Sequence, residues 1–316
     1  MISFLSSAKS FNGENRNNQL RAIKSWLSIS SEIEVILYGS TDGAMELSNT
    51  LGFKYIPQIE STPEGVPYFS AIVEHAKLYA RHDIQIYLNC NILMTESILK
   101  AVHAVKFSKY LMIGQRVDLH ENAQLMTDGP NWIHQLIQLQ KDNKLSLHPP
   151  SGKDYFIFPR GLWDGIPPLI VGRLGYDDGL LTFCFKRNIA VIDATYDVVS
   201  IHQFHNYNHL PGGKREYESG SDVIFNYQLL KTIHSSPLVS DANWTLRSGR
   251  LKKSYARGDL LRYIELILRY KLKTLYGGFV IRAIWRMLRA LRIHYVRNVE
   301  IEEVLKAYTV SAAMGK

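Results

Sequence analysis

The sequence predicts an α/β fold with a mostly parallel sheet flanked by helices. Two observations lead to this prediction: short apolar runs typical of buried strands recur along the N-terminal part of the chain, and segments of helical period separate them. A length of 316 residues with 46% apolar content is enough to bury a sizeable core. The alternation is that of successive βα units.

The expected elements follow one another in a regular order. Strands are expected at ISFLSS (2–7), IEVILYGS (33–40), FKYIPQ (53–58), IQIYLN (84–89) and YLMIGQR (110–116). Helices are expected over 17–29, where Leu20, Ile23 and Trp26 share one face, and over 68–82.

Polar residues follow several of these strands. In an open parallel sheet, ligands bind beyond the carboxyl ends of the strands. We therefore expect one crevice lined by Ser6 to Lys9, Gly39 to Thr41, Asn89 to Asn91, and Gln115 to Asp118. Taken singly, each stretch also suits an ordinary polar loop.

Charge divides the chain into two expected units. Residues 1–244 carry 21 Lys and Arg against 24 Asp and Glu, net −3, whereas residues 245–316 carry 16 against 5, net +11. The connector HSSPLVSDANW separates them. We expect a globular domain over 1–244 and a basic helical extension over 245–316.

Several classes of protein are not supported. The sequence has neither GxGxxG after the first strand nor GxxxxGK[ST], which argues against a Rossmann dinucleotide site and a P-loop. Two cysteines, Cys90 and Cys184, are too few for a disulfide framework, and MISFLSSAKSF does not read as a secretory leader, so a reducing cytoplasm is expected. No run of 18 apolar residues suggests a membrane span.

In order along the chain, six stretches over roughly residues 1–215 carry a resemblance: RAIKSWLSISSEIEVILYGSTDG, RHDIQIYLNCNILM, GQRVDL, DYFIFPRGLW, VGRLGYDDGLLTF and VIDATYDVVSIHQFHNYNHLPGG. They resemble GT-A type glycosyltransferases, in particular bacterial and plant nucleotide-diphospho-sugar transferase-like proteins. The resemblance implies a GT-A, Rossmann-like sheet and a nucleotide-sugar donor. It does not cover the basic extension.

The donor is expected at the converging polar strand ends, near Ser6, Gly39, Asn89 and Asn91. The family's strand typically ends Asn-x-Asp, so Asn91 departs from the pattern. An amide brings no charge, and hard cations favour carboxylates, so Mn²⁺ or Mg²⁺ at Asn91 and His202 is expected to be weakly held or absent. Lys214 and Arg215, in GGKREYE, are candidates to neutralise the diphosphate instead, although a solvated loop explains them equally well.

For catalysis, the resemblance aligns Asp177 of GRLGYDDGLLTF with the acid that inverting enzymes use to deprotonate the acceptor. Asp178 is then expected to cap the following helix, and a capping role for both residues remains the alternative. Asp118 and Asp154 are further acceptor-side candidates. Trp163 is expected to offer a ring face to a sugar, unless it is simply part of the core.

The histidines of IHQFHNYNH allow a metal-hydrolase alternative. His202, His205 and His209, with Asp193 upstream, have suitable residue types. Their spacing brings them together only on a helix, and the segment reads as a strand followed by a loop, which disfavours this alternative.

The extension contains a basic amphipathic pattern over 279–298, with Arg282, Arg286, Arg289 and Arg297 on one side of a helical wheel. Such a helix suits an anionic membrane surface, which would place the protein on the inner face of the membrane. Packing on the first domain or on a second subunit is the alternative. No nucleic-acid partner is expected, because RNA-binding motifs and interleaved aromatic residues are lacking.

Taken together, these features predict a glycosyltransferase that uses a nucleotide sugar and a glycan or lipid-linked acceptor in surface polysaccharide assembly. A non-catalytic nucleotide- or glycan-binding protein on the same fold is the alternative, because Asn91 lacks the expected charge.

Overall fold

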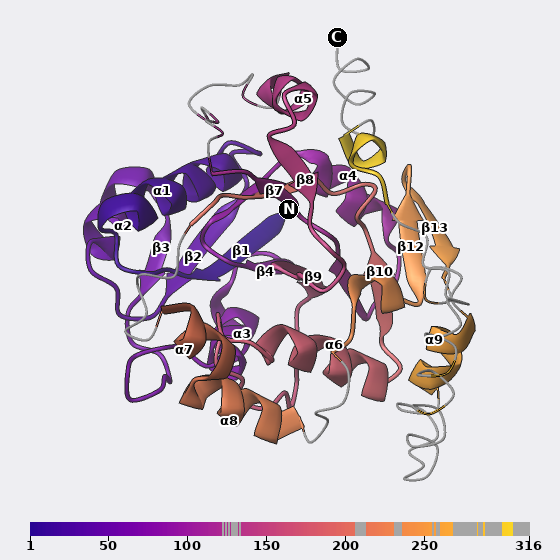
Figure 1. Cartoon of the computed structure of the whole chain (residues 1–316). Helices are drawn as coiled ribbons and strands as arrows, with labels where there is room; N and C mark the ends of the chain where they lie inside the picture. Colours follow the sequence, from indigo (N-terminus) through magenta and orange to yellow (C-terminus); the bar gives the residue numbers. More distant parts are fainter. Residues whose placement is uncertain are drawn as a thin grey trace.

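The computed structural model describes residues 1–121, 123, 125, 127, 132, 134–205, 213–230, 236–254, 256, 260–267, 283, 287 and 299–305. Over these residues the fold is a mixed α/β arrangement around a nine-stranded sheet of order β13-β12-β10-β6-β9-β4-β1-β2-β3 (Figure 1). Its strands are β1 (Ile2–Ser7), β2 (Glu34–Tyr38), β3 (Lys54–Ile56), β4 (Ile84–Leu88), β6 (Tyr110–Ile113), β9 (Tyr155–Pro159), β10 (Ala190–Asp193), β12 (Trp244–Arg247) and β13 (Arg250–Lys253).

Most neighbouring strands of this sheet run parallel, which confirms the predicted fold class. Strand β9 is an exception, because it runs antiparallel to both β4 and β6, and β13 is antiparallel to β12. Since β9 runs opposite to its neighbours, it begins at the edge where β4 and β6 end. The residues that lead into β9 are thereby brought to the predicted crevice.

A second, four-stranded sheet has the order β5-β11-β7-β8. Its strands are β5 (Ile92–Met94), β7 (Val117–Leu119), β8 (Leu145–Leu147) and β11 (Ser200–His202). β5 and β7 follow β4 and β6 closely in the chain, so this sheet adjoins the carboxyl ends of the large sheet. The sequence predicted a strand at β11 but did not reveal β5, β7 and β8 as separate elements.

Helices cover both faces of the large sheet (Figure 1). α1, α2 and α4 pack on one face, α3, α6 and α8 pack on the other, and α5 packs against β8 of the small sheet. The helices are α1 (Gly13–Leu27), α2 (Ala44–Leu51), α3 (Phe69–Tyr79), α4 (Ser97–Ala104), α5 (His134–Lys141), α6 (Tyr176–Lys186), α7 (Gly213–Ser219), α8 (Ser221–Leu230), the 3₁₀ helix η1 (Val239–Asp241) and α9 (Leu260–Leu266).

Strand periodicity explains the two cores. In β2, Val35 and Leu37 belong to the core beneath α1, while Ile36 and Tyr38 belong to the core beneath α3. Successive side chains of a strand point to opposite faces, so a strand buried on both sides must be apolar throughout. The uninterrupted apolar runs in the sequence reflect this double burial.

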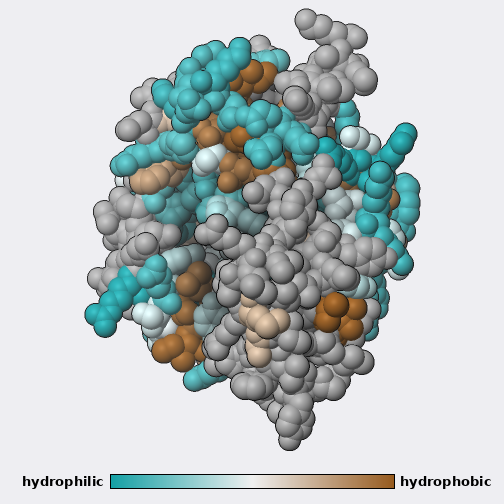
Figure 2. All heavy atoms as spheres, turned by 45° about the vertical axis from the view of Figure 1, so that its right-hand side comes forward, coloured by the Kyte–Doolittle hydropathy of each residue, from teal (hydrophilic) through white to brown (hydrophobic). Residues whose placement is uncertain are grey.

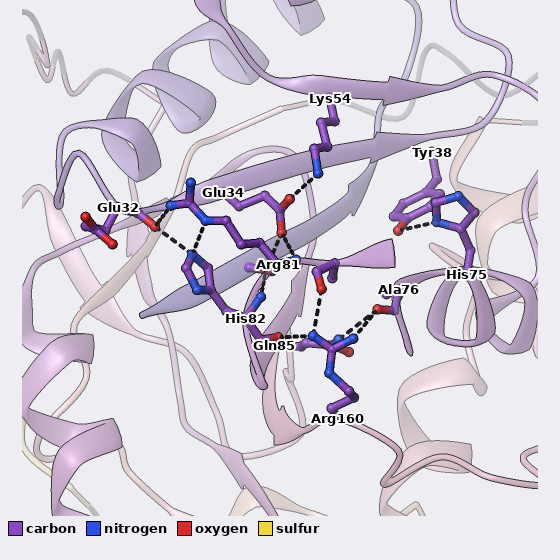
Figure 3. Close-up of polar contacts among 12 residues, drawn as sticks. Glu32, Glu34, Tyr38, Lys54, His75, Ala76, Arg81, His82, Gln85 and Arg160 are labelled. Carbon is purple, nitrogen blue, oxygen red and sulfur yellow. Dashed lines mark hydrogen bonds and ion pairs between the residues drawn. The ribbon is translucent and has the colours of Figure 1, made fainter. Parts of the chain in front are cut away.

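The amino ends of the strands carry a structural polar network (Figure 3). Glu34, at the start of β2, accepts hydrogen bonds from Ser3 Oγ at 2.5 Å, Lys54 Nζ at 2.6 Å and the backbone nitrogen of Arg81 at 2.7 Å. Burial opposes ionisation, but these donors outweigh it and lower the pKa of Glu34. The network ties β1, β2 and β3 together at the edge opposite the predicted crevice.

The expected domain boundary at residue 244 falls on the first residue of β12. That strand pairs in parallel with β10, and β13 continues the sheet to Lys253. Further along, Arg262 of α9 forms a buried ion pair with Asp241, at 2.7 Å between Nη2 and Oδ2. The globular part therefore includes residues beyond the expected boundary. Of the basic segment 279–298, all residues but Ala283 and Met287 lie outside the described part of the chain.

Among the described helices, none is both long enough and apolar enough to cross a bilayer. The face in Figure 2 shows mostly hydrophilic residues where the chain is described, with apolar residues in separate patches. The described surface on this side therefore carries no single large apolar area.

Candidate functional site

A cavity of about 830 Å³ opens at the carboxyl ends of the parallel strands. Residues after β1, β2 and β4 line it together, namely Ser7–Ser10, Gly39–Thr41 and Asn89–Asn91. Ser6 lies just beneath and donates from Oγ to the carbonyl oxygen of Leu88 at 2.7 Å, which joins β1 to β4. Of the expected stretch 115–118, Arg116 is the residue that lines the cavity.

Gly39 shows why the chain needs glycine at this edge. Its φ is +95°, a left-handed conformation, and a Cβ atom there would lie 2.8 Å from Pro67 Cγ. The missing side chain lets the loop before α3 approach the end of β2, where both line the cavity.

The small sheet brings Asn91 and His202 together. His202 pairs with Ile92 of β5 on one side and with Asp118 of β7 on the other. Its Nε2 lies 3.0 Å from Asn91 Nδ2, and its Nδ1 lies 3.6 Å from Asp118 Oδ1. Burial and then the charge of Arg116 lower the pKa of His202 to about 3, so its imidazole is neutral at physiological pH.

An arginine cluster lies next to this pair. Arg116 Nε donates to Asp118 Oδ1 at 2.8 Å, and Arg116 Nη1 pairs with Asp154 Oδ2. Asp118 Oδ2 is 2.6 Å from His148 Nδ1, and Asp154 Oδ1 accepts from Asn89 Nδ2 at 2.6 Å. Burial opposes ionisation of Asp118, but His148 and Arg116 lower its pKa to about 2. Burial likewise opposes ionisation of Asp154, but Arg116 and then His202 and Asn89 lower its pKa.

A lysine cluster forms another wall of the cavity, at the start of α6. Lys153 Nζ lies 2.8 Å from Asp178 Oδ1 and 3.1 Å from Asp177 Oδ2, and its side chain is 1% exposed. Nζ also donates to the carbonyl oxygens of Ser151 and Pro237, each at 3.0 Å. Burial raises the pKa of Asp177 to about 6; the Lys153 charge opposes this shift and Asp178 adds to it.

Two expectations about residue roles are wrong. Trp163 is 4% exposed and packs against Phe69, Phe158 and Phe183 in the core, so it does not line the cavity. Asp178 does not cap α6: the N-cap residue is Gly175, without a side-chain cap, and Asp178 instead pairs with Lys153. Both errors concern residues whose partners come from distant parts of the chain.

The remaining predicted residues lie at different distances from the cavity. Asp154 lines it, whereas Asp118 does not line it and contacts three side chains that do, those of Arg116, His148 and His202. Arg215 is exposed on α7 and is not part of the cavity wall. The side chain of Lys214 lies outside the described part of the structure.

The histidine alternative gains little support. The rings of His202 and His205 lie 5.2 Å apart, but His209 falls outside the described residues. Asp193 is buried in β10, where it accepts from Thr195, and it does not line the cavity. The four residues are therefore not shown to meet.

The residues at Asn91 and His202 do not fit a divalent cation. Because the Asn91 amide donates to His202 Nε2, the ring lone pair that would bind a metal already accepts a hydrogen bond. The nearest carboxylates, Asp118 and Asp154, are bonded to Arg116. Within the described residues, no group of three or more His, Cys, Asp and Glu side chains is arranged to hold a metal. Hard cations need several free oxygen ligands, which this arrangement does not offer.

Sequence reasoning included Arg116 in the expected crevice stretch 115–118 but gave it no role, and it missed His148 and Lys153. Arg116, at the end of a predicted strand, and Lys153, just before the apolar run YFIF, stand out in retrospect as single basic residues within GQRVDL and SGKDYF. A basic residue beside an apolar strand indicates a buried ion pair only when its acidic partners are known, and here they come from other segments.

Comparisons with known proteins give distant likenesses. No family model matches the chain, and no curated protein matches it. Glucosyl-3-phosphoglycerate synthase from Mycobacterium tuberculosis, solved with Mn²⁺, uridine diphosphate and phosphoglyceric acid, superposes with a TM-score of 0.42 and 17% identity over 74% of this chain and 80% of that one.

Two further solved structures are similar at the same level. S. aureus TarS 1–349 with UDP-GlcNAc gives a TM-score of 0.44 and 10% identity over 86% of this chain and 74% of that one. The 4-diphosphocytidyl-2C-methyl-D-erythritol synthase of Anaerococcus prevotii gives 0.35 and 15% over 73% and 99%. All three TM-scores are below 0.5, so a functional assignment depends on this chain's own residues.

Proposed function

We propose that this chain is a GT-A type glycosyltransferase that moves a sugar from a nucleotide sugar to a glycan or lipid-linked acceptor. One observation carries the proposal: the polar ends of β1, β2 and β4 and the carboxylate of Asp177 line the same cavity. Ligands of open α/β sheets bind at such strand ends, and a carboxylate across the cavity can act on a second substrate. Gly39, Asn89 and Asn91 belong to the donor side.

Asp177 acts as the base of an inverting reaction. Its carboxylate takes the proton of the acceptor hydroxyl while that oxygen attacks the anomeric carbon, and the bond from this carbon to the diphosphate oxygen breaks. A pKa of about 6 leaves Asp177 ionised at neutral pH yet more basic than an ordinary carboxylate. With its side chain 18% exposed, Asp177 can reach a hydroxyl in the cavity. Lys153 holds it in position.

A thermal-shift screen of the full chain against UDP, GDP, CMP and dTDP sugars tests the proposal. One nucleotide class should raise the melting temperature, and the shift should grow with the ligand concentration. Incubation with the stabilising donor and a mixture of glycan acceptors should then release the nucleotide. Binding without release would favour a non-catalytic binder, and no shift with any nucleotide would contradict the donor site.

We further propose that residues 245–316 hold the enzyme on the inner face of a membrane, where a lipid-linked acceptor for surface polysaccharide is presented. The net charge of +11 supports this, because each basic residue near an anionic leaflet contributes about 1 kcal/mol. The full chain should float with anionic vesicles at low salt and not with neutral ones.

The matched variant for flotation keeps the whole chain and replaces Arg282, Arg286, Arg289 and Arg297 by Gln. This substitution is preferable to truncation at residue 244, which would remove β12 and β13 from the sheet. The variant should stay unbound under conditions that float the unaltered chain. Equal flotation of the two proteins would contradict the membrane role of this segment.

A further inference from the structure

Two cations of the cavity lie where a donor diphosphate would need them. Lys9 follows β1, Arg173 lies in the loop before α6, and both line the cavity next to the Asn89–Asn91 strand end. Gln19 fixes the backbone of Lys9, because its side chain accepts from Lys9 N at 2.6 Å and donates to Lys9 O at 2.9 Å. Asp222 of α8 holds Arg173, at 3.1 Å from Nε.

Arg173 pairs with a single carboxylate, that of Asp222, which distinguishes it from Arg116 and Lys153 in the cavity wall. Arg116 and Lys153 are each bonded to two carboxylates, so the negative charge of the partners exceeds the positive charge of each side chain. Lys9 and Arg173 are close enough that burial and then the Arg173 charge lower the pKa of Lys9 to about 8. Two like charges kept together in a partly buried wall repel each other, and an anion between them relieves that repulsion.

Given the proposed function, we infer that Lys9 and Arg173 bind the donor diphosphate directly and take the place of a divalent cation. At the strand end that would carry the metal ligands, Asn91 supplies no negative charge, and its Nδ2 lies 3.0 Å from His202 Nε2. Charge-assisted hydrogen bonds from ammonium and guanidinium groups to phosphate are strong enough for this role. They also stabilise the charge that develops on the leaving diphosphate.

Calorimetric titration of the full chain with UDP, GDP, CDP and dTDP tests this inference. The nucleotide that binds should do so with an affinity that changes less than threefold between excess EDTA and saturating Mn²⁺. Binding only in the presence of Mn²⁺ would overturn the inference and leave the proposed function standing. No binding of any nucleotide in either condition would overturn both.

Substitutions of Lys9 and Arg173 test whether these two residues bind the diphosphate. Lys9→Met and Arg173→Met should each weaken binding in EDTA by about 10- to 100-fold, the usual effect of losing one charge-assisted hydrogen bond. Lys77→Met is the matched control, because the exposed side chain of Lys77, on α3, pairs with Asp164 and does not line the cavity. Lys9→Arg keeps the charge and should bind within a few-fold of the unaltered chain, so a folding defect is distinguishable from the loss of a cation. Unchanged affinity in both Met variants would overturn the assignment.

A gain of metal binding provides an independent check. Asn91→Asp supplies the carboxylate that the strand end lacks, so this variant should bind Mn²⁺ more tightly than the unaltered chain when titrated with the metal alone. Equal and tight Mn²⁺ binding by both proteins would show that other ligands build a metal site, which would overturn the inference.

Discussion

The arginine cluster and the lysine cluster have the same composition, one cation with two carboxylates. A carboxylate pKa is nevertheless lowered in the first cluster and raised in the second. Around Arg116, the pKa of Asp118 is about 2, because His148 and Arg116 overcome the effect of burial. Beside Lys153, burial and the neighbouring Asp178 raise the pKa of Asp177 to about 6. Both clusters border one cavity.

The number of hydrogen-bond donors explains the difference. The two carboxylates bonded to Arg116, those of Asp118 and Asp154, come from separate segments, and each accepts from its own guanidinium nitrogen. Each also has a second partner, which is His148 for Asp118 and Asn89 for Asp154. The carboxylates of Asp177 and Asp178 are consecutive in α6 and share a single ammonium group, which also serves two carbonyl oxygens. A guanidinium offers five donors in a fixed fork and an ammonium only three. Donor supply, more than the count of cations, decides which carboxylate can accept a proton.

The largest expected effect concerns catalysis. Asp177→Asn should lower the rate of transfer by about 10²- to 10⁴-fold while donor affinity stays unchanged, because the base is lost and the donor side is not. Release of the nucleotide from the donor measures the rate, and calorimetry measures the affinity. Asp178→Asn is the matched control and should cost far less. An equal loss in the two variants would move the base away from Asp177.

Stability at neutral pH should separate the clusters next. Asp154→Asn removes a partner from the buried Arg116 pair and should lower the free energy of unfolding by about 3 kcal/mol. Asp177→Asn removes a charge that burial disfavours, so it should leave the free energy of unfolding unchanged or raise it. Urea unfolding of the two variants provides the comparison. If both lose the same stability, the contrast between the clusters is wrong.

The smallest expected effect is the dependence of stability on pH. The folded-state pKa of Asp118 is below its ordinary value, so its contribution of about 2 kcal/mol is present above about pH 4 and is lost as the pH falls to about 2. The folded-state pKa of Asp177 is above its ordinary value, so its protonated form stabilises the fold, and that contribution is lost as the pH rises from about 4 to about 6.

Unfolding curves collected across this range can assign the two contributions. Asp118→Asn should flatten the stability profile below pH 4, and Asp177→Asn should flatten it between about pH 4 and 6. A profile in which Asp177→Asn changes only the acid limb would show that its pKa is not raised.

The central strands β1, β2, β4 and β6 of the large sheet were predictable because they are buried on both faces. That burial requires unbroken apolar runs such as IEVILY, and these are visible in the sequence alone. The meeting of Gly39 and Asn89 at one edge followed from the parallel arrangement. Strand β9 was less visible, because nothing local in YFIFP distinguishes an antiparallel strand inserted between β4 and β6 from a parallel one.

The ion pairs of the site were not predictable, because each depends on contacts between distant segments. Asp177 was selected from its motif, but its partner Lys153 lies in the loop before β9 and pairs with it only after the sheet has formed. Trp163 was a candidate for stacking on a sugar because the resemblance places its stretch beside the acceptor, whereas three phenylalanines from α3, β9 and α6 enclose it. The local sequence identifies each residue, but it does not show which side chains from distant segments will contact it.

The consecutive positions of Lys153 and Asp154, just before β9, have a mechanical consequence. Lys153 holds the proposed base, and Asp154 holds both Arg116 and the Asn89 amide at the end of β4. The peptide unit that joins Lys153 to Asp154 therefore connects the side of the cavity that holds the proposed base to the side that holds Arg116 and Asn89. A displacement of this peptide unit would change the distance between Asp177 and the donor-binding residues at the end of β4. An insertion between Lys153 and Asp154 would separate these two sides while leaving every side chain of the site intact.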